Sequence, residues 1–176
     1  MSVQTTLTKV ELDIASGNLG EARDRLHGLV SSYPYDLSLR SRLAEVYWRL
    51  QYPAMAGRYW YLKEDKSSEM VAACRQFERS CGGDPLIMLQ ALRFRGDIDP
   101  IRETYAGRLL LDLRDRAKRE RGVVFRFNKS GRDRYGVVPA RTALQVVGGL
   151  LVLGTLAALV AIGIFTVFGW IANAIR

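Results

Sequence analysis

GNLGEARDRLHGLVSSYP (residues 17–34) and LAEVYWRLQYPAMAGRYW (residues 43–60) repeat one arrangement of small and large apolar side chains. The matching residues, each pair 34 positions apart, are Ala22 with Ala56 and Leu26 with Trp60. A small alanine lets two packed helices approach closely, and the large side chain one turn later fills the groove between them. The spacing therefore predicts stacked pairs of helices.

Over about residues 3–62 this pattern resembles the tetratricopeptide-repeat family. It departs in the first helix, where Lys9 and Asp13 stand at positions that usually hold large apolar or aromatic side chains. A later pair, residues 70–81 and 86–94, lacks the alanine in register and is interpreted as a degenerate third unit or a cap. The resemblance implies a scaffold whose concave face binds a peptide or a partner helix. The candidate residues for that face, which we expect to be exposed, are Arg40, Glu45 and Arg49; ordinary solvated surface is the alternative.

Capping residues, prolines and glycines divide the first 121 residues into helices, so the predicted fold class is all-α. A side-chain acceptor followed by proline opens several of them, because proline needs no donor in the first helical turn. The predicted helices run from Leu7 to near Gly17, over 19–32, 37–50 and 53–62, from Ser67 or Ser68 to Gly82, from Asp84-Pro85 to Gly96, and from Asp99-Pro100 to Gly122.

The end of the sequence predicts one transmembrane helix at residues 143–175. The stretch from Leu144 to Ile175 has no ionisable side chain and outlasts the roughly 20 apolar residues that cross a bilayer. Trp170 suits the headgroup level near its far end. Basic residues precede this stretch, so we expect the N-terminal part in the cytoplasm of a single-pass, tail-anchored protein of the cell membrane. The N-terminus has no signal-peptide pattern.

Ten Lys or Arg and three acids between Arg114 and Arg141 supply seven of the eight formal positive charges. Beside a membrane we expect them to contact anionic headgroups, with Phe125, Phe127 and Tyr135 entering the interface; nucleic acid is the less favoured partner, and a plain topology signal is the alternative. Residues 123–127 and 132–138 are prone to form a short hairpin, with an extended basic linker as the alternative. The candidate lipid-contacting residues are Arg126, Lys129, Arg132, Arg134 and Arg141.

Small residues recur four positions apart in the predicted span, a spacing that lets two membrane helices approach closely. A homodimer through the span is the corresponding hypothesis, and the general abundance of Gly and Ala in membrane helices is the alternative. The residues concerned are Gly154, Ala157, Ala158 and Ala161.

Nothing in the sequence forms a catalytic or cofactor-binding motif: nucleotide-loop, zincin, nucleophile-elbow and CxxC patterns are all lacking. His27 has no triad pattern around it, and we expect Cys74 and Cys81 to be buried, inert thiols. Aromatic residues crowd positions 47–61, which predicts a core between two helix pairs, with a ligand or partner cleft as the alternative. We therefore expect no metal, no cofactor and no enzymatic activity.

Three regions follow: a cytoplasmic tetratricopeptide-like helical domain at 1–121, a basic juxtamembrane linker at 122–142, and the transmembrane helix. This order is similar to that of an uncharacterised family of small bacterial membrane proteins. The function that we expect is a non-enzymatic adaptor that binds a cytoplasmic protein at the membrane. The alternative is a small structural subunit of a larger membrane complex, bound through its transmembrane helix.

Overall fold

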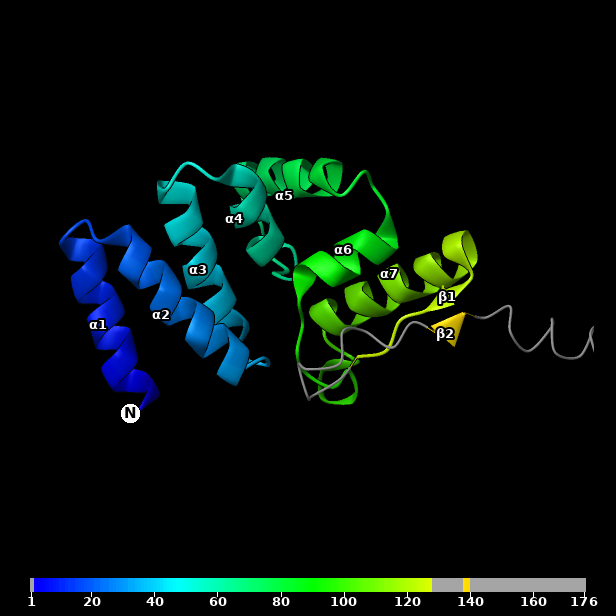
Figure 1. Ribbon diagram of the computed structural model, residues 1–176, viewed down its shortest axis with the longest axis horizontal. Helices are drawn as coiled ribbons and strands as arrows, with labels where there is room; N and C mark the ends of the chain where they lie inside the picture. The colour runs from blue at the N-terminus through cyan, green and yellow to red at the C-terminus, as the bar shows by residue number, and fades with distance from the viewer. Residues whose placement is uncertain (1, 128–137, 140–176) are drawn as a thin grey trace, which may run out of the picture. The chain divides into compact units, whose positions relative to one another are not determined.

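The computed structural model describes residues 2–127 and 138–139, and their regular secondary structure is helical apart from one short pair of strands (Figure 1). The elements are α1 (Val3–Ala15), α2 (Leu19–Ser32), α3 (Leu37–Arg49), α4 (Pro53–Trp60), α5 (Ser68–Ser80), α6 (Pro85–Leu92), the 3-10 helix η1 (Asp99–Ile101), α7 (Tyr105–Arg121), β1 (Val123–Val124) and β2 (Val138–Pro139). The predicted all-α class is confirmed for this part of the chain.

The helix starts follow from local capping chemistry. The side chain of Ser67 accepts a hydrogen bond from the Met70 N–H at the start of α5. Asp84 accepts from Leu86 and Ile87 at the start of α6, whose first residue is Pro85. These bonds satisfy backbone donors that a helix leaves open at its first turn. The predicted starts of the fifth and sixth helices are therefore confirmed.

The predicted start of the last helix at Asp99-Pro100 is wrong. Only η1 forms there, and α7 begins at Tyr105, where the Thr104 hydroxyl accepts a hydrogen bond from the Gly107 N–H at 3.2 Å. Gly107 explains the break, because a Cβ at this position would overlap the carbonyl of Ile101. The chain thus folds η1 directly against the first turn of α7 instead of running through as one helix.

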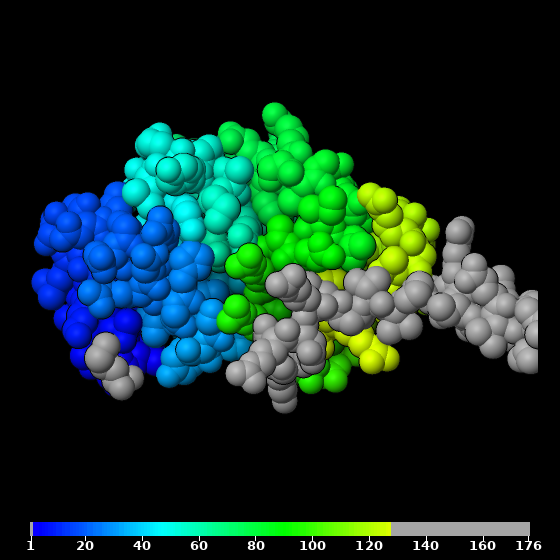
Figure 2. Space-filling model, in the orientation of Figure 1, coloured from blue at the N-terminus to red at the C-terminus, as the bar shows by residue number. Residues whose placement is uncertain are grey.

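Neighbouring helices in the sequence are also neighbours in space from α1 to α5, and α6 packs against α7 (Figure 1). Side chains fill the space between successive helices on the face that Figure 2 shows. The packing of each helix on the preceding one stops after α5, because α6 packs mainly against α7. Buried apolar residues from all seven α-helices form one hydrophobic cluster.

A close contact between two helices joins α4 and α5 at Gly57. A Cβ on Gly57 would overlap the backbone carbonyl of Ala73. The thiol of Cys74 also contacts the Gly57 carbonyl oxygen, with 3.5 Å between Sγ and O. Only a residue without a side chain allows the two backbones to lie this close.

β1 pairs with β2 in a two-stranded sheet, so the outer ends of the two β-prone runs do come together. The turn between them falls outside the described residues. Phe125 is buried, and its ring lies 5.2 Å from that of Phe127, which in turn lies 6.4 Å from the Phe94 ring. The expectation that Phe125 and Phe127 enter a membrane interface is wrong, because both pack onto the hydrophobic cluster of the helical domain.

Within the part of the chain that the structure describes, no helix combines the length and apolar character needed to cross a bilayer. The predicted transmembrane helix at 143–175 lies outside the described residues, as do the small residues proposed to join two such helices, Gly154, Ala157, Ala158 and Ala161. Of the candidate lipid-contacting residues, Arg126 is exposed, and Lys129, Arg132, Arg134 and Arg141 lie outside the described residues.

The contact at Gly57 predicts that Gly57→Ala lowers the free energy of unfolding by about 3 kcal/mol or more, because two backbones must move apart to admit a methyl group. Gly28→Ala is the matched control. Gly28 lies within α2, a Cβ there would contact nothing, and alanine should stabilise that helix by roughly 1 kcal/mol. Urea unfolding of the full-length variants measures both values, and an equally stable Gly57→Ala variant would contradict the close contact.

Candidate functional site

The predicted partner-binding residues lie on α3 but do not share one environment. Glu45 and Arg49 are exposed, in agreement with the expected face. Arg40 is only 3% exposed, so its assignment to that face is wrong. The physical reason is that α3 turns Arg40 toward the end of α6, where its Nη2 donates a hydrogen bond to the Leu92 carbonyl oxygen at 2.9 Å.

The aromatic residues at positions 47–61 divide between core and surface. The four buried members are Tyr47, Tyr59, Trp60 and Tyr61, which confirms the predicted core for these residues. Trp48 and Tyr52 keep 37% and 57% of their surface exposed. The Trp48 ring lies 5.8 Å from the ring of buried Trp60, at an angle of 51°. The exposed pair at the end of α3 is therefore an extension of a buried aromatic cluster.

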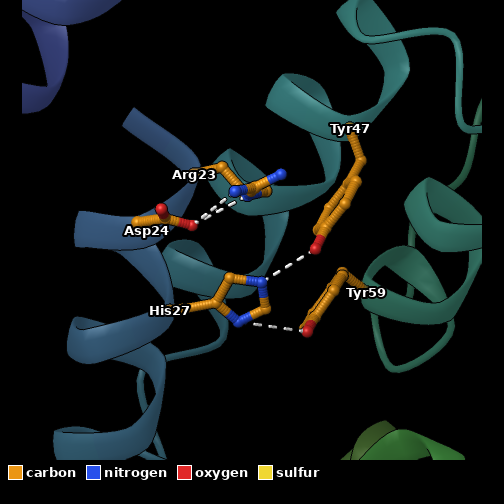
Figure 3. Close-up of polar contacts among 5 residues, drawn as sticks. All are labelled: Arg23, Asp24, His27, Tyr47 and Tyr59. Carbon is orange, nitrogen blue, oxygen red and sulfur yellow. Dashed lines mark hydrogen bonds and ion pairs between the residues drawn. The ribbon is translucent and has the colours of Figure 1, made fainter. Parts of the chain in front are cut away.

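His27 joins three helices through two tyrosines, as Figure 3 shows. Its Nε2 lies 2.8 Å from the hydroxyl of Tyr47 on α3, and its Nδ1 lies 3.4 Å from the hydroxyl of Tyr59 on α4. The two tyrosine rings are stacked, with their centroids 5.6 Å apart and their planes within 6° of parallel. We call His27, Tyr47 and Tyr59 the His–Tyr cluster.

The surroundings of His27 favour its neutral form. Burial lowers the pKa of His27 most, and the positive charges of Arg58, Arg23 and Arg93 lower it further, while Asp24 opposes them. Asp24 is itself paired with Arg23 at 2.8 Å (Figure 3). A neutral imidazole has one donor and one acceptor nitrogen, so it can donate to one tyrosine oxygen and accept from the other hydroxyl.

Beside the His–Tyr cluster lies a pocket of about 240 Å³ between α2, α3, α4 and the end of α6. Four of its lining residues carry guanidinium groups, and none carries a carboxylate. We call it the arginine pocket. Its lining residues are His27, Val30, Ser31, Arg40, Arg58, Tyr59, Leu92, Arg93 and Arg95.

Arg40 is the innermost charge of the arginine pocket. Burial, together with the neighbouring charge of Arg58, lowers the pKa of Arg40 to about 10, which still leaves it positively charged at neutral pH. Its guanidinium carbon lies 5.2 Å from the centroid of the Tyr59 ring. Its Nε is buried and has no hydrogen-bond partner among the residues that the structure describes. A buried cation with an unused donor costs free energy unless something else compensates it.

The two thiols lie away from the arginine pocket. Cys74 and Cys81 are buried and unpaired with one another. Burial raises the pKa of the Cys74 thiol to about 11 and also raises that of Cys81, so neither forms a thiolate at neutral pH. The prediction that both thiols are buried is confirmed. Within residues 2–127 and 138–139, no group of His, Cys, Asp or Glu side chains is arranged to hold a metal ion.

Sequence reasoning set His27 aside and did not connect it with the tyrosines or with Arg93 and Arg95. A local signal existed, because Arg23, His27 and Ser31 recur every four residues and so share one side of α2. The partners of that side stand 20 and 32 residues further along the chain. No local spacing identifies partners at such a separation.

Comparison with known proteins gives one match. A family model described as "Family of unknown function (DUF6584)" matches residues 1–174 of the chain. No curated protein and no solved structure matches it. The family description names no activity.

The environment of His27 predicts a loss of stability on mild acidification. Because its folded-state pKa lies below the ordinary value of 6.5, the unfolded chain binds more protons than the folded chain between those two values. The contribution of the neutral His27 to the free energy of unfolding is complete above the ordinary pKa. It is lost as the pH falls from that value toward the folded-state pKa. We expect urea unfolding of the full-length chain to require less urea at about pH 5.5 than at about pH 7.5, with a slope below the one-proton limit of about 1.4 kcal/mol per pH unit.

His27→Gln is the control for this slope, because it removes the only histidine of the sequence and leaves no side chain that ordinarily titrates in this range. The variant should be less stable at neutral pH but nearly independent of pH over the same interval. An identical slope in the two proteins would show that His27 is not kept neutral by folding.

Proposed function

The chain belongs to the DUF6584 family, a family of unknown function. We propose that this chain is a non-enzymatic adaptor at the cell membrane. Its tetratricopeptide-like helical domain binds a cytoplasmic protein. Its C-terminal segment anchors that domain to the cytoplasmic face of the membrane as a single span. The proposal needs no cofactor.

The helical repeat supports the first part of the proposal. Ala22 and Ala56, which are equivalent in the 34-residue spacing, are both completely buried, and so is Leu26. Trp60, the equivalent of Leu26, is 3% exposed. Small and large residues therefore occupy the packing positions that the repeat requires, on α2 and on α4 alike.

The single observation that carries the proposal is the exposed surface at the end of α3. Glu45, Trp48 and Arg49 lie within two turns on this helix, and Tyr52 follows directly after it. Trp, Tyr and Arg are the residue types that most often dominate binding energy at protein interfaces. Exposed aromatic rings bordered by one acid and one base suit a protein partner. We call Glu45, Trp48, Arg49 and Tyr52 the α3 face.

The sequence supports the second part of the proposal. An uncharged apolar segment of sufficient length follows a stretch that holds seven of the eight net positive charges, and this order supports a cytoplasmic side for the helical domain. Basic side chains in that stretch, Arg126 among them, would contact anionic headgroups, each contributing about 1 kcal/mol near the surface. Self-association of the span through Gly154 and Ala158 would make the adaptor a dimer.

A photo-crosslinking experiment tests the α3 face. A photoreactive amino acid at position 48 of the full-length chain, expressed in its native cells, should yield one reproducible protein adduct. Arg49→Glu should reduce the affinity for that partner by about tenfold or more, since central arginines are frequent binding hot spots. The matched control carries the photoreactive residue at position 87, because Ile87 is also exposed and apolar.

Equal adducts from positions 48 and 87, or no adduct at all, would contradict the proposed surface. A chain that ends at Arg141 separates the adaptor from the alternative of a structural subunit. The adaptor should keep its partner in this shortened form. A subunit held through the span should lose every partner.

Alkaline carbonate extraction tests the anchor. We expect the full-length chain to stay in the membrane pellet, because an inserted apolar helix is not released by high pH or by loss of charge contacts. The chain that ends at Arg141 should appear in the supernatant. Release of the full-length chain would contradict membrane anchoring and leave only peripheral binding through the basic stretch.

A further inference from the structure

The arginine pocket brings four guanidinium groups together in a small cavity of the helical domain, apart from the α3 face. We propose that this pocket binds a phosphate group, either as a free phosphate or as the phosphate monoester of a small molecule or lipid headgroup. The inference concerns a ligand of the domain itself, goes beyond the proposed adaptor function and does not depend on it.

Uncompensated charge is the first argument. Arg40, Arg93 and Arg95 form no ion pair with a carboxylate among the described residues, although seven other arginines do. The pocket lining contains no acid that could neutralise them. Arg93 and Arg95 are exposed and Arg40 is buried, and like charges that line one pocket repel one another unless an anion binds between them.

The state of Arg40 is the second argument. Its side chain is almost fully buried, one terminal nitrogen is fixed on the Leu92 carbonyl, and the buried Nε remains without a partner. A guanidinium presents its donors in a planar fork that matches the oxygen atoms of a phosphate. A phosphate oxygen in the pocket would supply both the missing acceptor and the missing negative charge.

The position of Arg93 is the third argument. Arg93 ends α6 with a φ of 45°, in the left-handed region. Glycine or asparagine usually occupies such a helix end, because a longer side chain is strained there. Arg93 stands at this turn and Arg95 follows two residues later, and both line the pocket.

The size of the pocket limits the ligand. Its volume of about 240 Å³ lies below the roughly 300–1,000 Å³ that is typical of sites for larger organic molecules. A phosphate or the end of a small phosphate ester fits this space, whereas a whole nucleotide requires more. A dianion also gains more from several converging cations than a single carboxylate does.

His27 offers a direct readout, because it lines the pocket and is the only histidine of the sequence. A bound phosphate would place negative charge beside a ring whose pKa neighbouring arginines hold low. Binding must therefore raise the pKa of His27. The change appears in the pH titration of one imidazole resonance in the NMR spectrum.

The experiment uses the full-length chain in a non-ionic detergent, with inorganic phosphate as the probe and chloride at equal ionic strength as the reference. We expect saturable binding by calorimetry and an upward shift of the His27 pKa. Arg95→Gln, at an exposed position that should not disturb folding, should weaken phosphate binding by about tenfold. Arg79→Gln removes an equally exposed arginine outside the pocket and should leave the affinity unchanged.

Arg40→Met separates a ligand-binding role from a purely structural one. It should abolish phosphate binding, because the innermost cation of the pocket is lost. Its stability in chloride reports the structural part separately, since the apolar side chain removes both the buried charge and the bond to the Leu92 carbonyl oxygen. If phosphate behaves like chloride, or if Arg79→Gln weakens binding as much as Arg95→Gln, the proposal is overturned.

Two further titrations identify the source of the phosphate group. The full-length chain is placed in phosphatidylcholine nanodiscs with or without phosphatidic acid, and inorganic phosphate is titrated into each. Loss of phosphate binding only in the presence of phosphatidic acid assigns the pocket to a lipid headgroup. Equal binding in both assigns it to a soluble phosphate compound.

Discussion

The hydrogen bond from Arg40 to the carbonyl oxygen of Leu92 spans 52 residues and joins α3 to the end of α6. A second long-range bond, from the Asp97 N–H to the hydroxyl of Tyr35, lies in the same region. The Tyr35 ring also lies 6.1 Å from the Phe94 ring, so polar and apolar contacts join the same two segments. Burying the Arg40 cation costs free energy, and the hydrogen bond that joins α3 to the end of α6 offsets part of this cost. The arginine pocket lies where these two helices meet.

Two surfaces of the domain then have different chemistry for physical reasons. The α3 face carries aromatic rings beside one acid and one base, so it suits a broad contact with another protein. The arginine pocket concentrates positive charge in a small volume, so it suits a compact anion. The His–Tyr cluster lies between the two, because Tyr47 belongs to α3 while His27 and Tyr59 line the pocket. Occupation of the pocket would thus act on the packing of the helix that carries the proposed partner surface.

The sequence predicted the features that depend on residues close together in the chain, such as the starts of α5 and α6. The cap at Ser67 and the Asp84-Pro85 start are recognisable because the acceptor and its donors stand within three positions. Asp99-Pro100 has the same local pattern but begins no long helix, since the contact of Gly107 with Ile101 redirects the chain. Arg40 likewise occupies an ordinary polar position on a helix. Its burial is decided by α6, and the roles of His27 and Gly57 are also decided by distant partners, so no local pattern identifies them.

The packing of each helix from α1 to α5 on its neighbour in sequence has a consequence for biosynthesis. A fold built from local contacts has a low contact order and forms quickly, because little chain entropy is lost before each contact is made. From α2 to α5, each helix finds the preceding helix already synthesised when it leaves the ribosome. The bond from Arg40 to Leu92 and the bond from Asp97 to Tyr35 must wait until residues 92–97 have emerged, so the arginine pocket is completed after α1 to α5 can have packed.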